Sequence, residues 1–238
     1  MNTTVAGISY RAVIGRRRIW LLLLLPLVLI GLAVLLRLVG SADEATAGTL
    51  LSTFAIGTML PLTGLIAGTG VIGPEIDDGT IVHLLAKPIP RPVIALTKFL
   101  VAASLLAVFA ALPTYVAAWL LVRNEENIAV GFGLGALVGG IAYAAVFLLL
   151  GTLTRHAVTI GLAYALVWEG LVGGLVPGAR QFSVQQWANA IADRLSGSAF
   201  VGTDVTLGFA IPALIIVTVG ALLWTGQRLR SFSVTGDE

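Results

Sequence analysis

The sequence predicts an all-α integral membrane protein with six transmembrane helices, an N-terminal interfacial amphipathic helix and a short cytoplasmic helix. Hydrophobic residues make up 58% of the 238 residues, and charged residues only 11%, whereas a soluble domain carries about 25% charged residues. The hydrophobic residues form long continuous runs and do not alternate with polar ones, which favours membrane-spanning helices over a β-barrel. We expect residues 1–238 to form a single transmembrane domain.

Six apolar runs are long enough to cross a bilayer, which takes about 20 residues. They are Ile19–Val39, Thr49–Ile72, Val93–Val122, Ile128–Leu153, Val158–Val176 and Leu207–Thr225. The first run has a signal peptide as its alternative, because arginines precede it and small residues follow it. It is longer than the apolar core of a signal peptide, so we interpret it as a span.

The distribution of lysine and arginine predicts the orientation, because cytoplasmic loops are enriched in both. The richer set of helix ends carries Arg11, Arg16, Arg17, Arg18, Lys87, Arg91, Lys98, Arg155, Arg228 and Arg230. The opposite ends carry Arg37, Arg123, Arg180 and Arg194, diluted by six carboxylates. Both termini and the segment 75–91 are therefore expected in the cytoplasm of a multi-pass protein of a prokaryotic cell membrane.

Two further segments outside the spans show helical periodicity. In residues 1–18 and just after, Val5, Ile8, Ala12 and Ile19 recur at helical spacing, which predicts an amphipathic helix lying on the membrane lipid; a frayed terminus is the alternative. Residues 177–206 form the longest outer segment, with apolar residues at helical intervals and Ser183 as a plausible N-cap. We expect a helix there, either on the outer surface or slightly re-entrant.

The segment 75–91 is a polar island between two apolar runs. It begins with three carboxylates and ends with Lys87 and Arg91, and Ile81, Leu84 and Leu85 share one helical face between them. A short cytoplasmic helix with an apolar face is suited to docking another protein.

Catalytic and metal-binding patterns are missing from the sequence. There is no Gly-x-x-x-x-Gly-Lys-[Ser/Thr] motif for nucleotide phosphates, and the chain has no cysteine. His83 and His156 have no matching carboxylate pattern. We therefore predict a non-catalytic subunit that holds no metal and no cofactor and binds no nucleic acid.

Glu169 is the acidic residue deepest in an apolar run. Ionisable groups within a membrane usually face a cavity or a partner, which makes Glu169 a candidate for a translocation path or a dimer seam. The alternative places it near the outer leaflet, in contact with water or Arg180. Elsewhere, Gly64-x-x-x-Gly68 and Gly135-x-x-x-Gly139 predict close helix packing.

The cytoplasmic segment also carries a recognisable pattern in its topological position, between the second and third of six spans. The pattern Glu75-x-x-x-Gly79-Thr80-x-x-x-Leu84-Leu85-x-x-Pro88-x-x-Arg91, with Ile81 on the apolar face, resembles the cytoplasmic loop of permease subunits in type-2 ATP-binding-cassette exporters. The resemblance implies that this loop is a coupling helix that docks a separate ATPase subunit. It also implies a second permease subunit, identical or different, and ATP with Mg²⁺ on the partner ATPase. A secondary transporter, and a membrane-embedded scaffold or enzyme, are the alternative functions.

Overall fold

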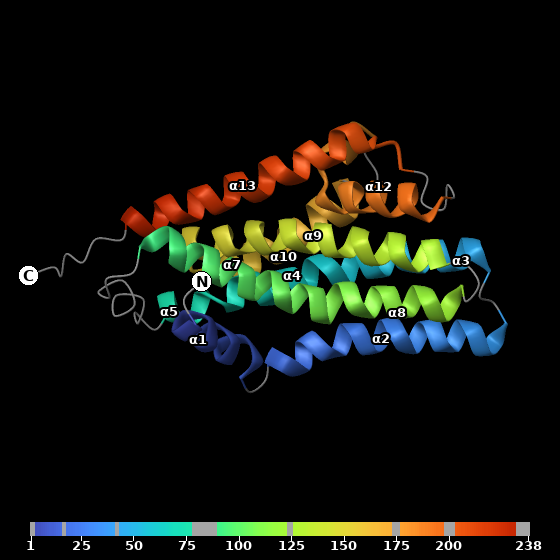
Figure 1. Cartoon of the computed structure of the whole chain (residues 1–238), viewed down its shortest axis with the longest axis horizontal. Helices are drawn as coiled ribbons and strands as arrows, with labels where there is room; N and C mark the ends of the chain where they lie inside the picture. The colour runs from blue at the N-terminus through green and yellow to red at the C-terminus, as the bar shows by residue number, and fades with distance from the viewer. Residues whose placement is uncertain are drawn as a thin grey trace, which may run out of the picture.

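A computed structural model of the chain describes residues 3–15, 18–40, 43–77, 90–122, 126–172, 177–197 and 203–231. These residues form a bundle of long helices lying side by side (Figure 1). Helix α1 and the C-terminal end of α13 lie at one end of the bundle, and α3 lies at the other. We call these the terminal end and the far end.

The described first half of the bundle consists of two short helices and three long rods. The elements are α1 (Thr3–Ile14), α2 (Arg18–Val39), a rod of α3 (Glu44–Thr49), π-helical η1 (Leu50–Met59) and α4 (Leu60–Gly70), the short α5 (Gly73–Asp77), and a rod of α7 (Arg91–Leu106), π-helical η2 (Ala107–Ala111) and α8 (Leu112–Leu121).

The second half is built around α9, the longest single α-helix. Its elements are α9 (Glu126–Leu153), α10 (Ala157–Ala163) with π-helical η3 (Tyr164–Val172), the 3₁₀ turn η4 (Pro177–Phe182), α12 (Val184–Ser196) and α13 (Leu207–Ser231).

Within the described residues, five helices are long and apolar enough to cross a membrane. They are Ile19–Val39, Glu44–Ile76, Arg91–Leu121, Asn127–Leu153 and Leu207–Arg230, which match five of the predicted spans. The predicted span 158–176 is described only as the shorter apolar helix Ala157–Leu171, and residues 173–176 lie outside the described part. The described helix therefore does not support the count of six spans, because its length stays below the roughly 20 residues that a bilayer needs.

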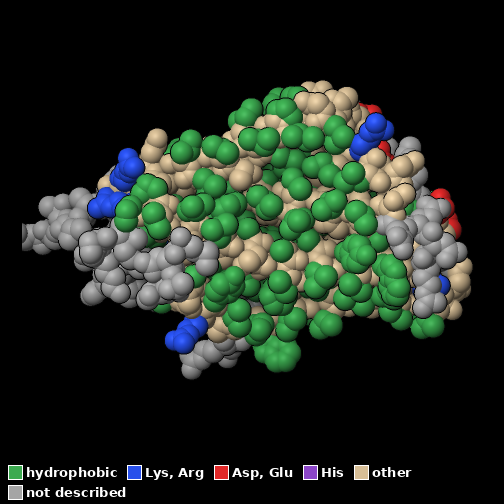
Figure 2. Space-filling model, viewed as in Figure 1, with side chains coloured by type: hydrophobic (Ala, Val, Ile, Leu, Met, Phe, Trp, Pro, Cys, Tyr) green, Lys and Arg blue, Asp and Glu red, His purple; other side chains and the backbone are tan. Residues whose placement is uncertain are grey.

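The outer surface has the polarity of a membrane protein. Figure 2 shows hydrophobic side chains over the middle of the bundle, with Lys and Arg at its ends and Asp and Glu at the far end. Helices α2 and α13 leave most of their apolar side chains exposed, as Leu38 at 80% and Ile216 at 69% illustrate. Such surface is stable only against lipid or another apolar surface.

Close helix packing occurs where the paired glycines predicted it. A Cβ on Gly68 of α4 would lie 2.6 Å from Phe147 Cβ of α9, so only a glycine permits this approach. On the other side of α9, a Cβ on Gly135 would lie 2.7 Å from the Ala188 carbonyl oxygen of α12. Helix α9 is thus the central helix, with α4 and α12 on different faces.

The helix in the segment 177–206 packs closely against α9. Gly131 of α9 faces the backbone of Ala192 and Ser196, whereas Gly139 faces Ala188. Helix α12 therefore runs antiparallel to α9 along more than two turns, and its first turn lies deeper in the bundle than its last (Figure 1). Whether this segment lies on the outer surface or re-enters the membrane stays a prediction.

A helix, α1, covers residues 3–14 of the predicted N-terminal segment. Val5, Ser9 and Val13 are buried against the bundle, whereas Ile8 is 46% exposed. That α1 lies on membrane lipid stays a prediction. Ile19 belongs to α2 and not to this helix. The helix turns its small and polar Ser9 inward because it packs against α7 and α4, where a lysine requires a polar neighbour, as described below.

Candidate functional site

The two stems of the predicted coupling loop are both described, and both are anchored to the helical bundle. Of the predicted docking residues, Glu75 and Arg91 lie in the described part. The other six, Gly79, Thr80, Ile81, Leu84, Leu85 and Pro88, lie outside it, so their docking role stays a prediction.

The first stem is held by a buried ion pair. Glu75 Oε1, on the short α5, lies 2.7 Å from Lys98 Nζ, on the second turn of α7. The lysine side chain is 0% exposed and that of Glu75 is 13% exposed. The ammonium also donates to the Val71 carbonyl oxygen at 2.6 Å and to Ser9 Oγ at 3.4 Å.

These contacts explain how a lysine is tolerated without water. A buried charge is costly unless it is paired and its remaining hydrogen-bonding groups are satisfied. Three acceptors from three helices match the three donors of an ammonium group. Helix α1 completes this cluster, and the Tyr10 hydroxyl shares a second hydrogen bond with Ser104 of α7. The cluster therefore joins α1, the loop stem and α7.

The second stem is held by an arginine at the start of α7. Arg91 Nη1 donates to the Leu229 carbonyl oxygen at 3.1 Å and also to the Arg230 carbonyl oxygen. The last carbonyl groups of a helix have no partner within it. A cation at this position satisfies them and interacts favourably with the negative end of the helix dipole. The loop thus ends on a residue that binds the C-terminal end of α13, which is predicted to lie in the cytoplasm.

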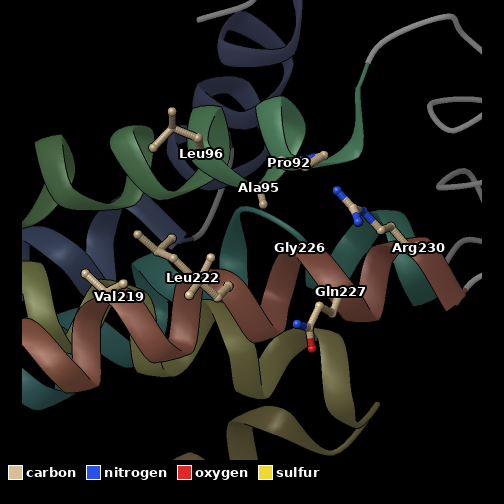
Figure 3. Close-up of a pocket in the computed structure, with 9 residues that line it drawn as sticks. Pro92, Ala95, Leu96, Val219, Leu222, Gly226, Gln227 and Arg230 are labelled. Carbon is tan, nitrogen blue, oxygen red and sulfur yellow. The ribbon is translucent and has the colours of Figure 1, made fainter.

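Beside this second stem, α7 and α13 enclose a cavity of about 350 Å³. Its walls are mostly apolar, and Figure 3 shows Arg230 reaching from α13 toward α7 at one end of it. Gly226 faces α7, where an added Cβ would lie 4.0 Å from Pro92 Cα. The cavity belongs to the contact between the helix that follows the loop and the last helix of the chain.

Between η3 and the first turn of α12, Glu169 is 1% exposed and is surrounded by hydrogen-bond donors. Oε1 accepts from the Tyr164 hydroxyl at 2.7 Å and from the Val184 amide at 3.2 Å. Oε2 accepts from the Ser183 hydroxyl and from the Gln185 amide at 3.3 Å. Ser183 Oγ in turn accepts from the Gln186 amide at 3.2 Å, which confirms Ser183 as the N-cap of α12.

Glu169 is a buried carboxylate whose described hydrogen-bond partners are protein donors. The residue binds the first turn of α12, where the amides have no partner within the helix and the dipole favours negative charge. Arg180, the other suggested partner, donates from Nη1 to Asp204 Oδ2 at 2.9 Å. Whether Glu169 also lines a translocation path or a dimer seam stays a prediction.

The sequence singled out Glu75 and Arg91 for docking and Glu169 for a path or seam, which stay predictions, and it did not indicate Lys98, Ser9 or Tyr164 as their neighbours. Lys98 was counted only as a cytoplasmic positive charge. The available signal was its position, because a lysine in the second turn of an apolar span needs a partner within the protein. No comparable signal marked Ser9 or Tyr164, whose roles depend on which helices pack together.

Among residues 3–15, 18–40, 43–77, 90–122, 126–172, 177–197 and 203–231, no group of three or more His, Asp or Glu side chains is placed to hold a metal ion. The described sites therefore consist of ion pairs, helix caps and cavities.

The apolar surface is that of a membrane protein. The anchored stems join the segment 75–91, which is predicted to lie in the cytoplasm, to several spans. Comparison with known families gives the same class: the family model for ABC-2 family transporter proteins matches residues 15–177. Because this match covers more than half of the chain, the protein belongs to the ABC-2 transporter family, as a multi-pass membrane permease. No curated protein matches the sequence.

Proposed function

We propose that this chain is the permease subunit of an ATP-driven exporter, and that its segment 75–91 docks a separate ATPase subunit carrying ATP and Mg²⁺. The observation that carries the proposal is that both stems of this segment are fastened to the bundle. Glu75 binds Lys98 within α7, and Arg91 binds the end of α13. A movement of the loop would therefore reach the spans directly.

The two anchors suggest how the loop would act on the bundle. The Glu75 cluster includes α1, α5 and α7, and the Arg91 contact includes α7 and α13. A push on the loop would shift α7 as one body, since α7 takes part in both anchors. Rigid-body motion of packed elements is a common way to couple two sites. Closure of two partner ATPases would supply the push.

The proposal includes a second permease subunit, identical or different. Helices α2 and α13 and the α10–η3 helix carry the broadest exposed apolar surface of the described residues, with Leu166 at 53% and Leu171 at 56% exposed on η3. Lipid and a partner permease would share this surface. The proposed location is a cell membrane of a prokaryote, with both termini in the cytoplasm.

Replacing both Leu84 and Leu85 by aspartate is expected to abolish co-purification of the partner ATPase. Each buried leucine is worth roughly 1.5–3 kcal/mol, and the variant would also bury two charges at the contact. The measurement is ATPase recovery on the tagged permease. The control is Leu195→Asp on α12, an exposed leucine at the far end. Undiminished ATPase recovery on a folded double variant would exclude this docking role.

The predicted orientation is tested by cysteine labelling in intact cells. The native chain has no cysteine, so single cysteines at Glu125 and His83 report without background. An impermeant maleimide is expected to label position 125 and to leave position 83 unlabelled until the cells are opened. The reverse pattern would invert the topology and place the loop 75–91 outside the cell.

A further inference from the structure

A polar cavity of about 340 Å³ lies between η1, η3, η4 and α12. Its volume falls in the range of small-molecule sites. Hydroxyl and amide side chains line most of it: Ser52, Thr53, Thr58, Gln185, Gln186 and Asn189. A polar cavity of this kind is unusual inside a protein whose composition is otherwise apolar, and its lining residues restrict which ligands fit it.

Asn189 provides the clearest sign of a missing ligand. The residue lines the cavity and is 2% exposed, and its Oδ1 has no hydrogen-bond partner among the described residues. An unsatisfied buried acceptor costs about 1–3 kcal/mol. Such a cost is understandable at a binding site, where a ligand that donates a hydrogen bond removes it.

The hydroxyl groups of the cavity also offer acceptors. Ser52 Oγ donates its proton to the Thr49 carbonyl oxygen at 3.4 Å, and Thr58 Oγ1 donates to the Thr53 carbonyl oxygen at 3.2 Å. Because each hydroxyl has one proton and two lone pairs, these two residues can only accept from a ligand. Asn189 Oδ1, Ser52 Oγ and Thr58 Oγ1 are therefore three hydrogen-bond acceptors, which favour a ligand rich in N–H or O–H donors.

The charged side chains at the cavity restrict the class of ligand further. Glu169, Arg180 and Asp204 together carry a formal charge of −1, since two carboxylates accompany one guanidinium. Glu169 and Arg180 both line the cavity, and Arg180 is paired with Asp204, whose side chain is 71% exposed. The four donors that Glu169 receives use all of its lone-pair positions, so it contributes charge and not a direct hydrogen bond. A cation gains from the field of this negative charge.

We propose that this cavity binds the primary ammonium group of a small organic cation, with Asn189 Oδ1, Ser52 Oγ and Thr58 Oγ1 as acceptors. An ammonium group has three N–H donors and one positive charge, which match the three acceptors and the net negative charge. The proposal concerns the membrane subunit alone, so it is independent of ATPase docking and is tested without ATP.

Two tryptophans beside the cavity allow ligand binding to be followed by their fluorescence. Trp168 Nε1 donates to the Phe182 carbonyl oxygen at 3.2 Å, and Trp187 Nε1 donates to the Gln181 carbonyl oxygen at 2.8 Å. Both indoles thus hold η4, the turn that carries Arg180. The experiment titrates the purified full-length permease in nanodiscs and follows tryptophan fluorescence.

Three probes separate charge from hydrogen bonding. n-Butylammonium has both, butyltrimethylammonium has the charge without N–H donors, and 1-butanol has a donor without the charge. We expect saturable binding of n-butylammonium at least about tenfold tighter than that of either other probe, corresponding to about 1.4 kcal/mol. Equal binding of butyltrimethylammonium would refute the acceptor set, equal binding of 1-butanol would refute the role of charge, and no saturable response would overturn the site.

Two variants test the residues. Asn189→Leu keeps the size of the side chain and removes the orphaned acceptor, so it should lower n-butylammonium affinity at least about tenfold without lowering the thermal midpoint. Gly57→Ala places a Cβ 2.6 Å from Gln185 Nε2, so the amide must move within the cavity, and binding should also weaken. The matched control is Asn127→Leu on an exposed position of α9. Unchanged affinity in Asn189→Leu, with the control also unchanged, would contradict the proposal.

Discussion

Replacing Lys98 by methionine is expected to lower the free energy of unfolding by about 3–5 kcal/mol, the usual cost of removing one partner from a buried ion pair. Methionine has a similar length and leaves no large cavity, so the loss would be mainly electrostatic. The variant takes the ammonium away from the Glu75 carboxylate and removes the donor to the Val71 carbonyl oxygen. Equilibrium unfolding of the permease in mixed detergent micelles measures the change.

A double variant separates the charge from the packing. In Glu75→Gln combined with Lys98→Met, neither side chain of the pair is charged, and we expect the double variant to recover part of the loss, as a double-mutant cycle would report. The control is Arg11→Met, which removes an exposed cation from α1 and should change stability by less than about 0.5 kcal/mol. If Lys98→Met is no more harmful than Arg11→Met, the ion pair does not hold the loop stem.

Most of the long helices could be predicted from the sequence because the membrane imposes one simple rule on them. A span must be apolar over about 20 residues, and the predicted runs Ile19–Val39 and Leu207–Thr225 agree with α2 and α13 to within a few residues at most ends. The N-cap of α12 was also predictable, because Ser183 and its amide partner Gln186 are three residues apart.

The remaining features depend on contacts between distant segments, which local patterns do not encode. The predicted span 158–176 contains Glu169, and the sequence did not indicate that this residue binds the first turn of α12. Lys98 and Ser9 lie 89 residues apart in sequence, so no spacing rule connects them. The burial of Ser9 on α1 likewise depends on what lies beneath the helix and not on the hydrophobic pattern of residues 1–18.

Glu169 combines both kinds of information. Its isolation in an apolar run indicated that it needed a partner, but the run itself could not say which one. The partner is a helix N-terminus 14 to 16 residues further along the chain. The carboxylate thereby connects η3 to α12, the helix that forms one wall of the polar cavity.

Replacing Glu169 by leucine is expected to destabilise the protein by about 2–5 kcal/mol and to open the first turn of α12. The Tyr164 and Ser183 hydroxyls can rotate toward other acceptors, but the Val184 and Gln185 amides are fixed by the backbone. Each buried amide left without an acceptor costs about 1–3 kcal/mol. Hydrogen–deuterium exchange would report faster exchange at these two amides, with α9 unchanged.

Glu169→Gln should have a smaller effect, because its amide oxygen still accepts from one pair of donors, whereas its NH₂ group faces the Gln185 amide. Asp204→Asn, at a side chain 71% exposed, is the control and should leave exchange in α12 unchanged. Unaltered protection of residues 184 and 185 in Glu169→Leu would refute the capping role. Transport and permease dimerisation, measured on Glu169→Gln in vesicles, then separate the remaining roles: lost transport with intact assembly supports a path, lost dimerisation supports a seam, and wild-type behaviour in both leaves Glu169 as the anchor of α12.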